Sequence, residues 1–180
     1  MVTVRYSSAS AAVTPSEAGV INGADVALLL DGMGAVEVIA EGASEEGQLK
    51  IYGNSPVKLT LNGLSLTSGK SAAINVQNKS VLYVHLPEGT ENHICDSKSR
   101  KDESYYPDGV VADDEKRNGA LYCKGSVVFG GNGLLQIDGK KKHGVSVKSS
   151  LTVRPGVTIA VSDVADNCFK AEGDSMWTGY

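Results

Sequence analysis

The sequence has no apolar run that approaches the roughly 18 residues of a membrane-spanning helix. Cysteine is also scarce, because the chain has only Cys95, Cys123 and Cys168. Their number and spacing match neither a disulfide framework nor a metal motif. Cys123 and Cys168 lie in apolar segments, so we expect both to be buried free thiols. We therefore predict neither a membrane span nor a disulfide-stabilised fold.

Positive charge is not in excess either. The chain has 17 basic and 21 acidic residues, which gives a formal net charge of −4. A nucleic-acid partner would require a basic stripe that displaces counterions from phosphates. The composition therefore argues against a function in nucleic-acid binding.

Helical periodicity is missing as well, since no window places apolar residues at i, i+3, i+4 and i+7 over three turns. Short runs of Val, Leu, Ile and Ala occur instead, bounded by Gly, Asn, Asp, Ser or Pro, and this pattern is typical of strands and turns. A chain of 180 residues is long enough for one full core but too short for two ordinary domains. The sequence therefore predicts a single all-β domain over residues 1–180.

The second half of the chain repeats itself. Residues 118–125 resemble residues 143–150, which begin 25 positions later, and these resemble residues 167–174, which begin 24 positions after that. Each copy has a short alternating strand, a polar corner, a second strand, a turn and a third strand. The first half repeats the pattern, most clearly over residues 57–84.

A fixed period in the twenties with three short strands predicts a right-handed parallel β-helix, a single-stranded solenoid with about 24 residues per coil. Stacked coils would bury one apolar side chain over another, and we expect this of Ile74, Leu121, Ile137, Val145 and Ile159. An antiparallel β-sandwich is the alternative, because Asn-Gly between strands is a hairpin signal. The short strands, and a register that persists through whole repeats, favour the β-helix.

Residues 88–117 interrupt the repeat with a polar insertion. Its most polar part, residues 96–115, holds seven of the 21 acidic residues: Asp96, Asp102, Glu103, Asp108, Asp113, Asp114 and Glu115. Calcium requires such oxygen ligands, although their order does not match an EF-hand loop. A solvated loop whose basic residues balance the acidic ones is the alternative interpretation. Tyr105 and Tyr106 in the same loop could stack on sugar rings or pack within the loop.

A second charged feature is the basic corner at Lys140, Lys141, Lys142 and His143. These side chains could bind sugar carboxylates or form a solvated turn. His143 aligns with Asn118 and Asn167, which predicts a corner position whose side chain bonds to the backbone rather than a catalytic histidine. Residues 167–174 begin a repeat that is not completed, so we expect a domain truncated at its C-terminus or closed by a short cap.

Residues 108–125 resemble a bacterial family of carbohydrate-binding domain-containing parallel β-helix proteins, of the clostridial and Bacteroides type. The resemblance extends from about Val4 to Asp174 and includes residues 56–63, 86–92, 142–148 and 166–171. It implies a shape like that of the pectate lyases, bound calcium, and adsorption to cellulose and to acidic polysaccharide without established lyase activity. It also implies calcium ligands at Asp113, Asp114, Asn118 and Asp166.

Together these features predict a non-catalytic, calcium-assisted polysaccharide-binding module of a bacterial surface or secreted protein. We expect a monomer that favours polygalacturonate-like or plant cell-wall polysaccharide. A structural or adhesive surface domain is one alternative, and a lyase of the pectate-lyase type is another. A lyase needs an Arg or Lys base beside calcium-binding carboxylates, and Arg154 has no such neighbour in the predicted arrangement. No catalytic residue is therefore predicted.

Overall fold

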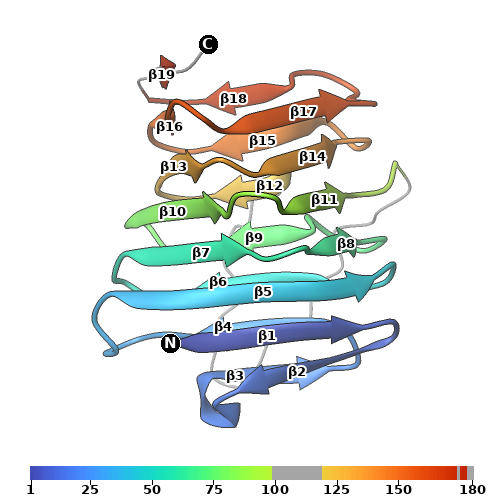
Figure 1. Cartoon of the computed structure of the whole chain (residues 1–180), viewed down its shortest axis with the longest axis vertical. Helices are drawn as coiled ribbons and strands as arrows, with labels where there is room; N and C mark the ends of the chain where they lie inside the picture. Colours follow the sequence, from blue (N-terminus) through green and yellow to red (C-terminus); the bar gives the residue numbers. More distant parts are fainter. Residues whose placement is uncertain (99–118, 174, 178–180) are drawn as a thin grey trace.

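The computed structural model describes residues 1–98, 119–173 and 175–177 (Figure 1). Within these residues the chain is all-β, apart from one 3₁₀ helix, η1 (Ser16–Ala18). The strands are stacked along the long axis, with the N-terminus near one end and the C-terminus at the other. No described helix has the length and apolar character needed to cross a membrane.

The strands form two sheets. The larger sheet, of 12 strands, has the order β17-β14-β11-β8-β5-β7-β10-β13-β16-β19, with β1 paired to β5 and β2 paired to β1. Its strands are β1 (Val2–Ser7), β2 (Ser10–Thr14), β5 (Val36–Ser44), β7 (Val57–Leu61), β8 (Ser65–Thr67), β10 (Val81–Leu86), β11 (Glu91–Cys95), β13 (Ser126–Gly131), β14 (Leu134–Asp138), β16 (Leu151–Val153), β17 (Thr158–Ser162) and β19 (Ser175–Trp177).

The smaller sheet has seven strands in the order β18-β15-β12-β9-β6-β4-β3 and lies behind the larger one in Figure 1. Its strands are β3 (Gly19–Asn22), β4 (Asp25–Leu29), β6 (Gln48–Tyr52), β9 (Ile74–Val76), β12 (Gly119–Cys123), β15 (His143–Val147) and β18 (Phe169–Ala171). Among the described strands, all pairs are parallel except β1–β2 and β3–β4. The antiparallel β-sandwich is therefore not the fold.

The predicted single-stranded parallel β-helix is also wrong. The strands belong to two sheets, and the larger sheet is strongly curled and continuous through β5, rather than being divided into separate faces with one short strand per coil. β5 is nine residues long and pairs with β7 through residues 36–40 and with β8 through residues 43–44. Gly42, with φ of 87°, lets β5 bend where its backbone passes that of Tyr6. The sequence repeat predicted a separate second and third strand in each copy. It could not show that β5 runs through both positions as one strand.

The register of the smaller sheet is 24 residues from β12 to β15 and from β15 to β18, and 47 residues from β9 to β12. Apolar residues of neighbouring strands stand opposite one another in this register: Ile74 on β9, Leu121 on β12, Val145 on β15 and Phe169 on β18. The sequence alignment was wrong by one position, because His143 stands opposite Gly119 rather than Asn118. Asn118 itself lies outside the described residues.

The core lies between the two sheets. The predicted burial of Ile74, Leu121, Ile137 and Val145 is confirmed, and Ile159 is partly buried against the same core. Full burial of an aliphatic side chain of this size contributes about 1.5–3 kcal/mol, so the apolar rows supply the main stabilisation of the stack.

Two of the three cysteines are buried. Cys95 and Cys123 are buried free thiols, and burial raises the pKa of Cys123 to about 12. The prediction for Cys168 is wrong, because this thiol is exposed. Cys168 immediately precedes β18, the edge strand of the smaller sheet, and no further described strand of that sheet covers it.

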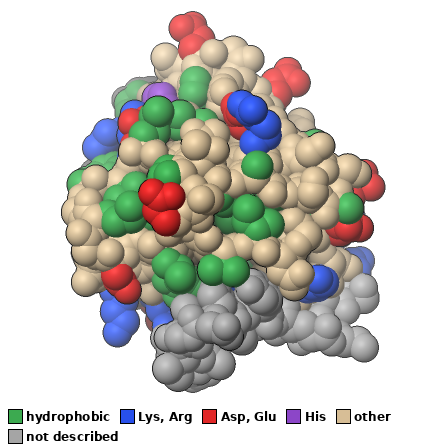
Figure 2. Space-filling view, turned by 90° about the horizontal axis from the view of Figure 1, so that it is seen from below, with side chains coloured by type: hydrophobic (Ala, Val, Ile, Leu, Met, Phe, Trp, Pro, Cys, Tyr) green, Lys and Arg blue, Asp and Glu red, His purple; other side chains and the backbone are tan. Residues whose placement is uncertain are grey.

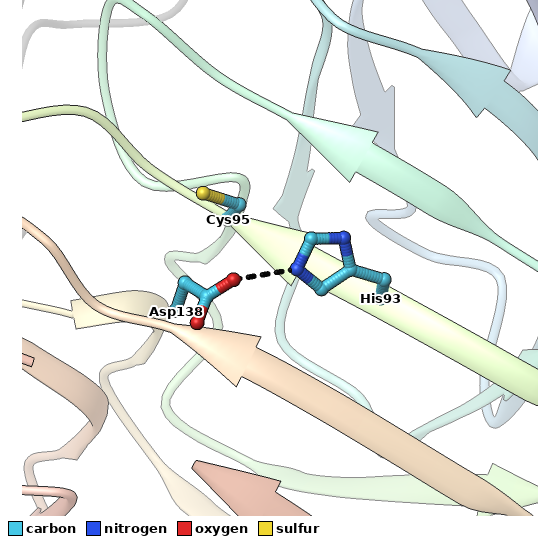
Figure 3. A group of neighbouring side chains, drawn as sticks. All are labelled: His93, Cys95 and Asp138. Atoms are coloured by element: carbon cyan, nitrogen blue, oxygen red, sulfur yellow. Dashed lines mark hydrogen bonds and ion pairs between the residues drawn. The ribbon is translucent and has the colours of Figure 1, made fainter. Parts of the chain in front are cut away.

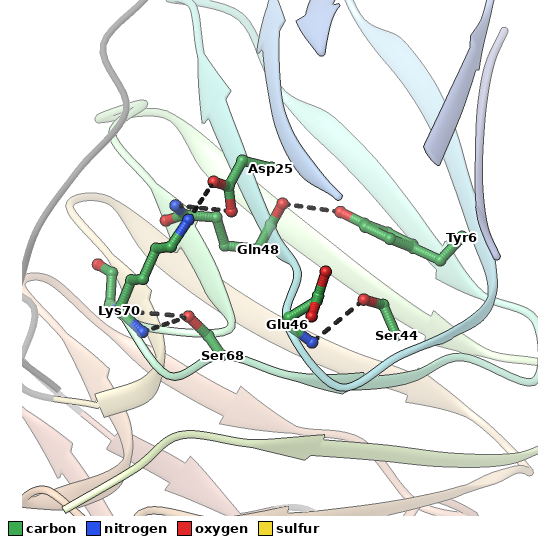
Figure 4. A network of polar contacts seen from close by, with 8 residues as sticks. Tyr6, Asp25, Ser44, Glu46, Gln48, Ser68 and Lys70 are labelled. Atoms are coloured by element: carbon green, nitrogen blue, oxygen red, sulfur yellow. Dashed lines mark hydrogen bonds and ion pairs between the residues drawn. The ribbon is translucent and has the colours of Figure 1, made fainter. Parts of the chain in front are cut away.

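The corners between strands are joined by a polar network near the N-terminal end (Figure 4). The hydroxyls of Ser44 and Ser68 each accept a hydrogen bond from the backbone N–H two residues further on. Buried Asp25 accepts a bond from Gln48 Nε2 at 3.1 Å and pairs with Lys70 Nζ at 3.0 Å. These contacts fix one repeat to the next.

The N-terminal end of the stack is covered by the two antiparallel pairs and η1. Val13 of β2 and Ala18 of η1 are buried and join the apolar core. Figure 2 views this end, where hydrophobic side chains appear only as small separate patches. The pairs thus protect a core that stacked parallel strands alone would leave open.

Candidate functional site

An exposed tyrosine occupies the outer face of the larger sheet. In β10, Leu82, Val84 and Leu86 are buried, so the alternating residues Tyr83 and His85 face outward. Register places Tyr83 between Lys58 of β7 and Val128 of β13. Tyr83 is 39% exposed, and the other large apolar residues that are this exposed in the described part of the chain are Met1, Ile21 and Met33.

A shallow hollow of about 190 Å³ lies beside this tyrosine and is lined mainly by Lys58, Tyr83, His85 and Arg154. We call these four residues the Tyr83 surface. The guanidinium carbon of Arg154 lies 5.9 Å from the centroid of the Tyr83 ring, within the range of a cation–π contact. Arg154 immediately follows β16, and its backbone N–H donates to the carbonyl of Phe129 at 3.0 Å.

A second hollow, of about 260 Å³, shares Lys58 and Tyr83 with the first and extends over Val36 and Glu37 of β5. Lys58 Nζ lies 3.4 Å from a carboxylate oxygen of Glu37. The two hollows thus meet at Tyr83 and lie over neighbouring strands from β5 to β16. Strands are about 4.8 Å apart, so four steps between these five strands give an open surface on the order of 19 Å long.

The basic corner predicted from the sequence lies between β14 and β15. Lys141 and Lys142 are exposed and Lys140 is half-buried, with its Nζ 3.8 Å from a carboxylate oxygen of Asp163. The backbone N–H of Lys141 donates to Asp96 Oδ1 at 3.3 Å. The three lysines are therefore held by backbone hydrogen bonds and by acidic neighbours. They lie away from the Tyr83 surface, on a different pair of strands.

His143 is fully buried at the start of β15. Its Nδ1 accepts a hydrogen bond from the backbone N–H of Asn167 at 3.2 Å, as expected of a corner side chain that bonds to the backbone. Burial lowers the pKa of His143, and the nearby charges of Lys142 and Lys170 act in the same direction while Asp166 opposes them. Its position gives the imidazole no exposed surface for a polymer.

Of the predicted calcium ligands, Asp166 alone is described. Its side chain is 53% exposed, one carboxylate oxygen lies 3.9 Å from His143 Nδ1, and its backbone N–H donates to the carbonyl of Lys142 at 2.8 Å. The structure thus places Asp166 beside the basic corner. The other predicted site residues lie outside the described residues: Tyr105, Tyr106, Asp113, Asp114 and Asn118.

Residues 22–174 match a family described as carbohydrate-binding domain-containing protein. The chain belongs to this carbohydrate-binding family. A carbohydrate-binding domain-containing protein of Acetivibrio thermocellus is 24% identical over 98 residues, which cover 54% of this chain and 32% of the relative. The chain thus aligns with about a third of that relative's length.

A solved structure of a polysaccharide lyase-like protein from C. thermocellum superposes with a TM-score of 0.72. The superposition covers 97% of this chain and 80% of the other, with 15% sequence identity. At that identity the likeness shows a shared fold. A carbohydrate-binding family is consistent with an open surface on the sheet.

Sequence reasoning missed the Tyr83 surface. The alternation over residues 81–84 contained a usable signal, because it places Tyr83 on the face opposite Leu82 and Val84. The contribution of Lys58 and Arg154 could not be read in the same way, since they are 25 and 71 positions from Tyr83 in the sequence. Only the register of the sheet brings them together.

A second group that the sequence did not reveal consists of His93, Cys95 and Asp138, which we call the His93 cluster (Figure 3). His93 Nε2 lies 2.8 Å from Asp138 Oδ2, and Asp138 Oδ1 accepts a bond from Ser162 Oγ at 2.8 Å. Burial acts to raise the pKa of Asp138, but the bonds from His93 and Ser162 outweigh it and the pKa is lowered. Burial raises the pKa of the Cys95 thiol.

Proposed function

We propose that this chain is a non-catalytic polysaccharide-binding module of a bacterial surface or secreted protein, and that the polymer lies across the Tyr83 surface. The observation that carries the proposal is an exposed aromatic ring on the outer face of the larger sheet, where two shallow hollows meet. A flat aromatic ring suits the C–H face of a pyranose. An extended chain of sugar rings can lie across both hollows, because neither hollow has to enclose the end of the polymer.

The charges around Tyr83 favour an acidic polysaccharide. Lys58 and Arg154 flank the ring, and a guanidinium can form two parallel hydrogen bonds with one carboxylate. The chain has a net charge of −4, so this local pair of cations matters more than the overall charge. We therefore propose a polymer of uronate units, such as polygalacturonate, in preference to a neutral glucan.

Calcium assistance is part of the same proposal. A calcium ion can bridge protein carboxylates and uronate carboxylates, which would help an acidic protein to hold an acidic polymer. The exposed carboxylate of Asp166 lies beside the basic corner, away from the Tyr83 surface, so a calcium ion there would hold a separate part of the polymer; the resemblance implies that Asp113, Asp114 and Asn118 complete the ligand set. Removal of calcium should then weaken binding without abolishing the contribution of Tyr83.

Isothermal titration with oligogalacturonate tests the proposal, with calcium or with EDTA in the buffer. Tyr83→Ala should weaken binding about tenfold, because loss of a stacking ring costs roughly 1–2 kcal/mol. Tyr83→Phe should bind nearly as well as the wild type, since it keeps the ring. Lys148→Gln removes a cation on the other sheet and should leave the affinity unchanged.

Two outcomes would contradict the proposal. The Tyr83 surface is not the binding site if Tyr83→Ala binds oligogalacturonate as tightly as Lys148→Gln does. A rise in ultraviolet absorbance from unsaturated uronide products would show that the chain cleaves the polymer instead of only binding it.

A further inference from the structure

The His93 cluster lies on the limb of the larger sheet formed by β8, β11, β14 and β17, on the other side of β5 in the strand order from the Tyr83 surface. The strand register explains why it forms. His93 and Cys95 are two residues apart on β11, so they share one face of the strand, while Ile94 between them is buried in the core. Cys95 stands opposite Asp138 of β14, and Asp138 stands opposite Ser162 of β17. Three neighbouring strands thus hold the cluster and its hydrogen-bonding partner.

The three side chains offer one nitrogen, one sulfur and one oxygen atom, all within 4.8 Å of one another. We propose that the His93 cluster is a binding site for a thiophilic divalent metal ion, of which Zn²⁺ is the best fit. The proposal is independent of polysaccharide binding, because no residue of the cluster lines the Tyr83 surface.

The distances are close to those that a tetrahedral zinc site needs. Zinc bonds of about 2.0–2.3 Å to oxygen, nitrogen and sulfur imply separations between ligand atoms of about 3.3–3.6 Å. The hydrogen bond between His93 Nε2 and Asp138 Oδ2, at 2.8 Å, must open by about half an ångström, and Cys95 Sγ must approach. The paired strands already hold the three ligand atoms within 4.8 Å of one another, so the adjustment is small.

The surroundings of the cluster also suit a metal ion. Ser162 donates to Asp138 Oδ1, which orients the carboxylate and leaves Oδ2 toward His93. The Cys95 thiol donates a hydrogen bond to the backbone carbonyl of Asp96 at 3.1 Å, and it would give up this bond on binding a metal ion. Lys140 is the nearby cation, and its charge is partly offset by Asp163.

The donor set selects the metal. Thiolate and imidazole are poor ligands for calcium, which takes six to eight oxygen atoms, whereas zinc accepts three protein ligands and a water molecule. The His93 cluster therefore differs from the proposed calcium site in metal preference as well as in place. Calcium in excess should not displace zinc from it.

The experiment uses a chain carrying Cys168→Ser, because Cys168 is exposed and could bind metal by itself. Titration with Co²⁺ should produce a thiolate-to-cobalt charge-transfer band and the intense visible bands of tetrahedral cobalt, saturating at one ion per chain. Zn²⁺ should abolish these bands, and Ca²⁺ should leave them unchanged. Cys123 is the other remaining thiol, and it is fully buried in the core.

Cys95→Ser in the same background should lose the charge-transfer band and bind zinc at least a hundredfold more weakly. His93→Gln and Asp138→Asn should each weaken zinc binding at least tenfold. Circular dichroism checks that each variant is folded, and the cobalt spectrum of the parent chain tests the proposal even where a variant is not. The proposal is overturned if the parent chain shows no cobalt–thiolate band, or if Cys95→Ser keeps it.

Discussion

The two limbs of the larger sheet have the same inner face and different outer faces. On one limb, β7, β10, β13 and β16 carry the Tyr83 surface, which is open and cationic. On the other, β8, β11, β14 and β17 carry the His93 cluster, which is closely hydrogen-bonded and partly buried. Both limbs begin at β5, and both send every second residue into one core.

This difference shows where chemistry can vary in such a fold. An inward residue must match the residues above and below it, because each repeat packs on its neighbours. An outward residue has no such restriction, and a row of outward residues from successive strands is brought within about 5 Å by the sheet spacing. Residues far apart in the sequence therefore form a site whenever they share a row.

The largest effect on stability should come from disrupting the bend between β13 of one limb and β14 of the other. Gly131 ends β13 with φ of 99°, and a Cβ atom there would collide with the backbone carbonyl of Leu86. Gly131→Ala should reduce the free energy of unfolding by about 3 kcal/mol, through strain in the left-handed region and the clash. Urea denaturation followed by circular dichroism measures this.

Gly63→Ala is the matched control for that substitution. Gly63 has φ of 74° but no atom within 4 Å of the added Cβ, so the cost should be near 1 kcal/mol. Equal costs for the two alanine variants would show that the close approach at Gly131 does not restrain the bend.

A smaller effect should follow from changing the outer face of one limb. Arg154→Gln should weaken binding of oligogalacturonate about three- to tenfold and reduce its dependence on salt, since one exposed cation is removed. The same variant should bind zinc normally, and Cys95→Ser should bind oligogalacturonate normally. Titration of both ligands against both variants tests this independence. Loss of both activities in either variant would mean that the limbs are coupled.

The sequence predicted the inner face better than the outer one. Periodicity identifies apolar positions such as Leu121 and Val145, because burial demands apolar residues at a constant interval. It could not reveal that Gly42 lets one edge of β5 pair with both β7 and β8. Nor could it join Cys95 to Asp138, which meet only through strand pairing.

The loss of stability at acid pH should come in part from His143, which lies outside both limbs of the larger sheet. His143 has a lowered pKa in the folded chain, so the unfolded chain binds more protons as the pH falls below about 6.5. Stability should therefore decline with falling pH through that range and level off below the folded pKa. His143→Asn, which matches Asn167 one repeat on, should flatten the decline in urea denaturation between pH 8 and pH 5. An unchanged slope would assign the proton uptake to other groups.

The smallest effect on stability concerns a row of outward-facing residues to which we assign only a structural role: Arg5, Glu41 and Asn62. Arg5 on β1 contacts Glu41 on β5, with Arg5 Nε 2.8 Å from Glu41 Oε1, and Asn62 donates to Oε2 at 3.1 Å. The hydrogen bonds from Arg5 and Asn62 lower the pKa of Glu41. A lowered carboxylate pKa adds stability above its unfolded value, and that stability is lost as the pH falls through the folded pKa.

Glu41→Gln should therefore cost about 0.5 kcal/mol at pH 7, since an exposed ion pair is screened by solvent. The difference from the wild type should disappear at a pH below the lowered pKa, as measured by urea denaturation at both pH values. Binding of oligogalacturonate and of zinc should be unaffected at pH 7. A change in either would mean that this row contributes to a functional surface, and that three rather than two outer faces of the sheet carry chemistry.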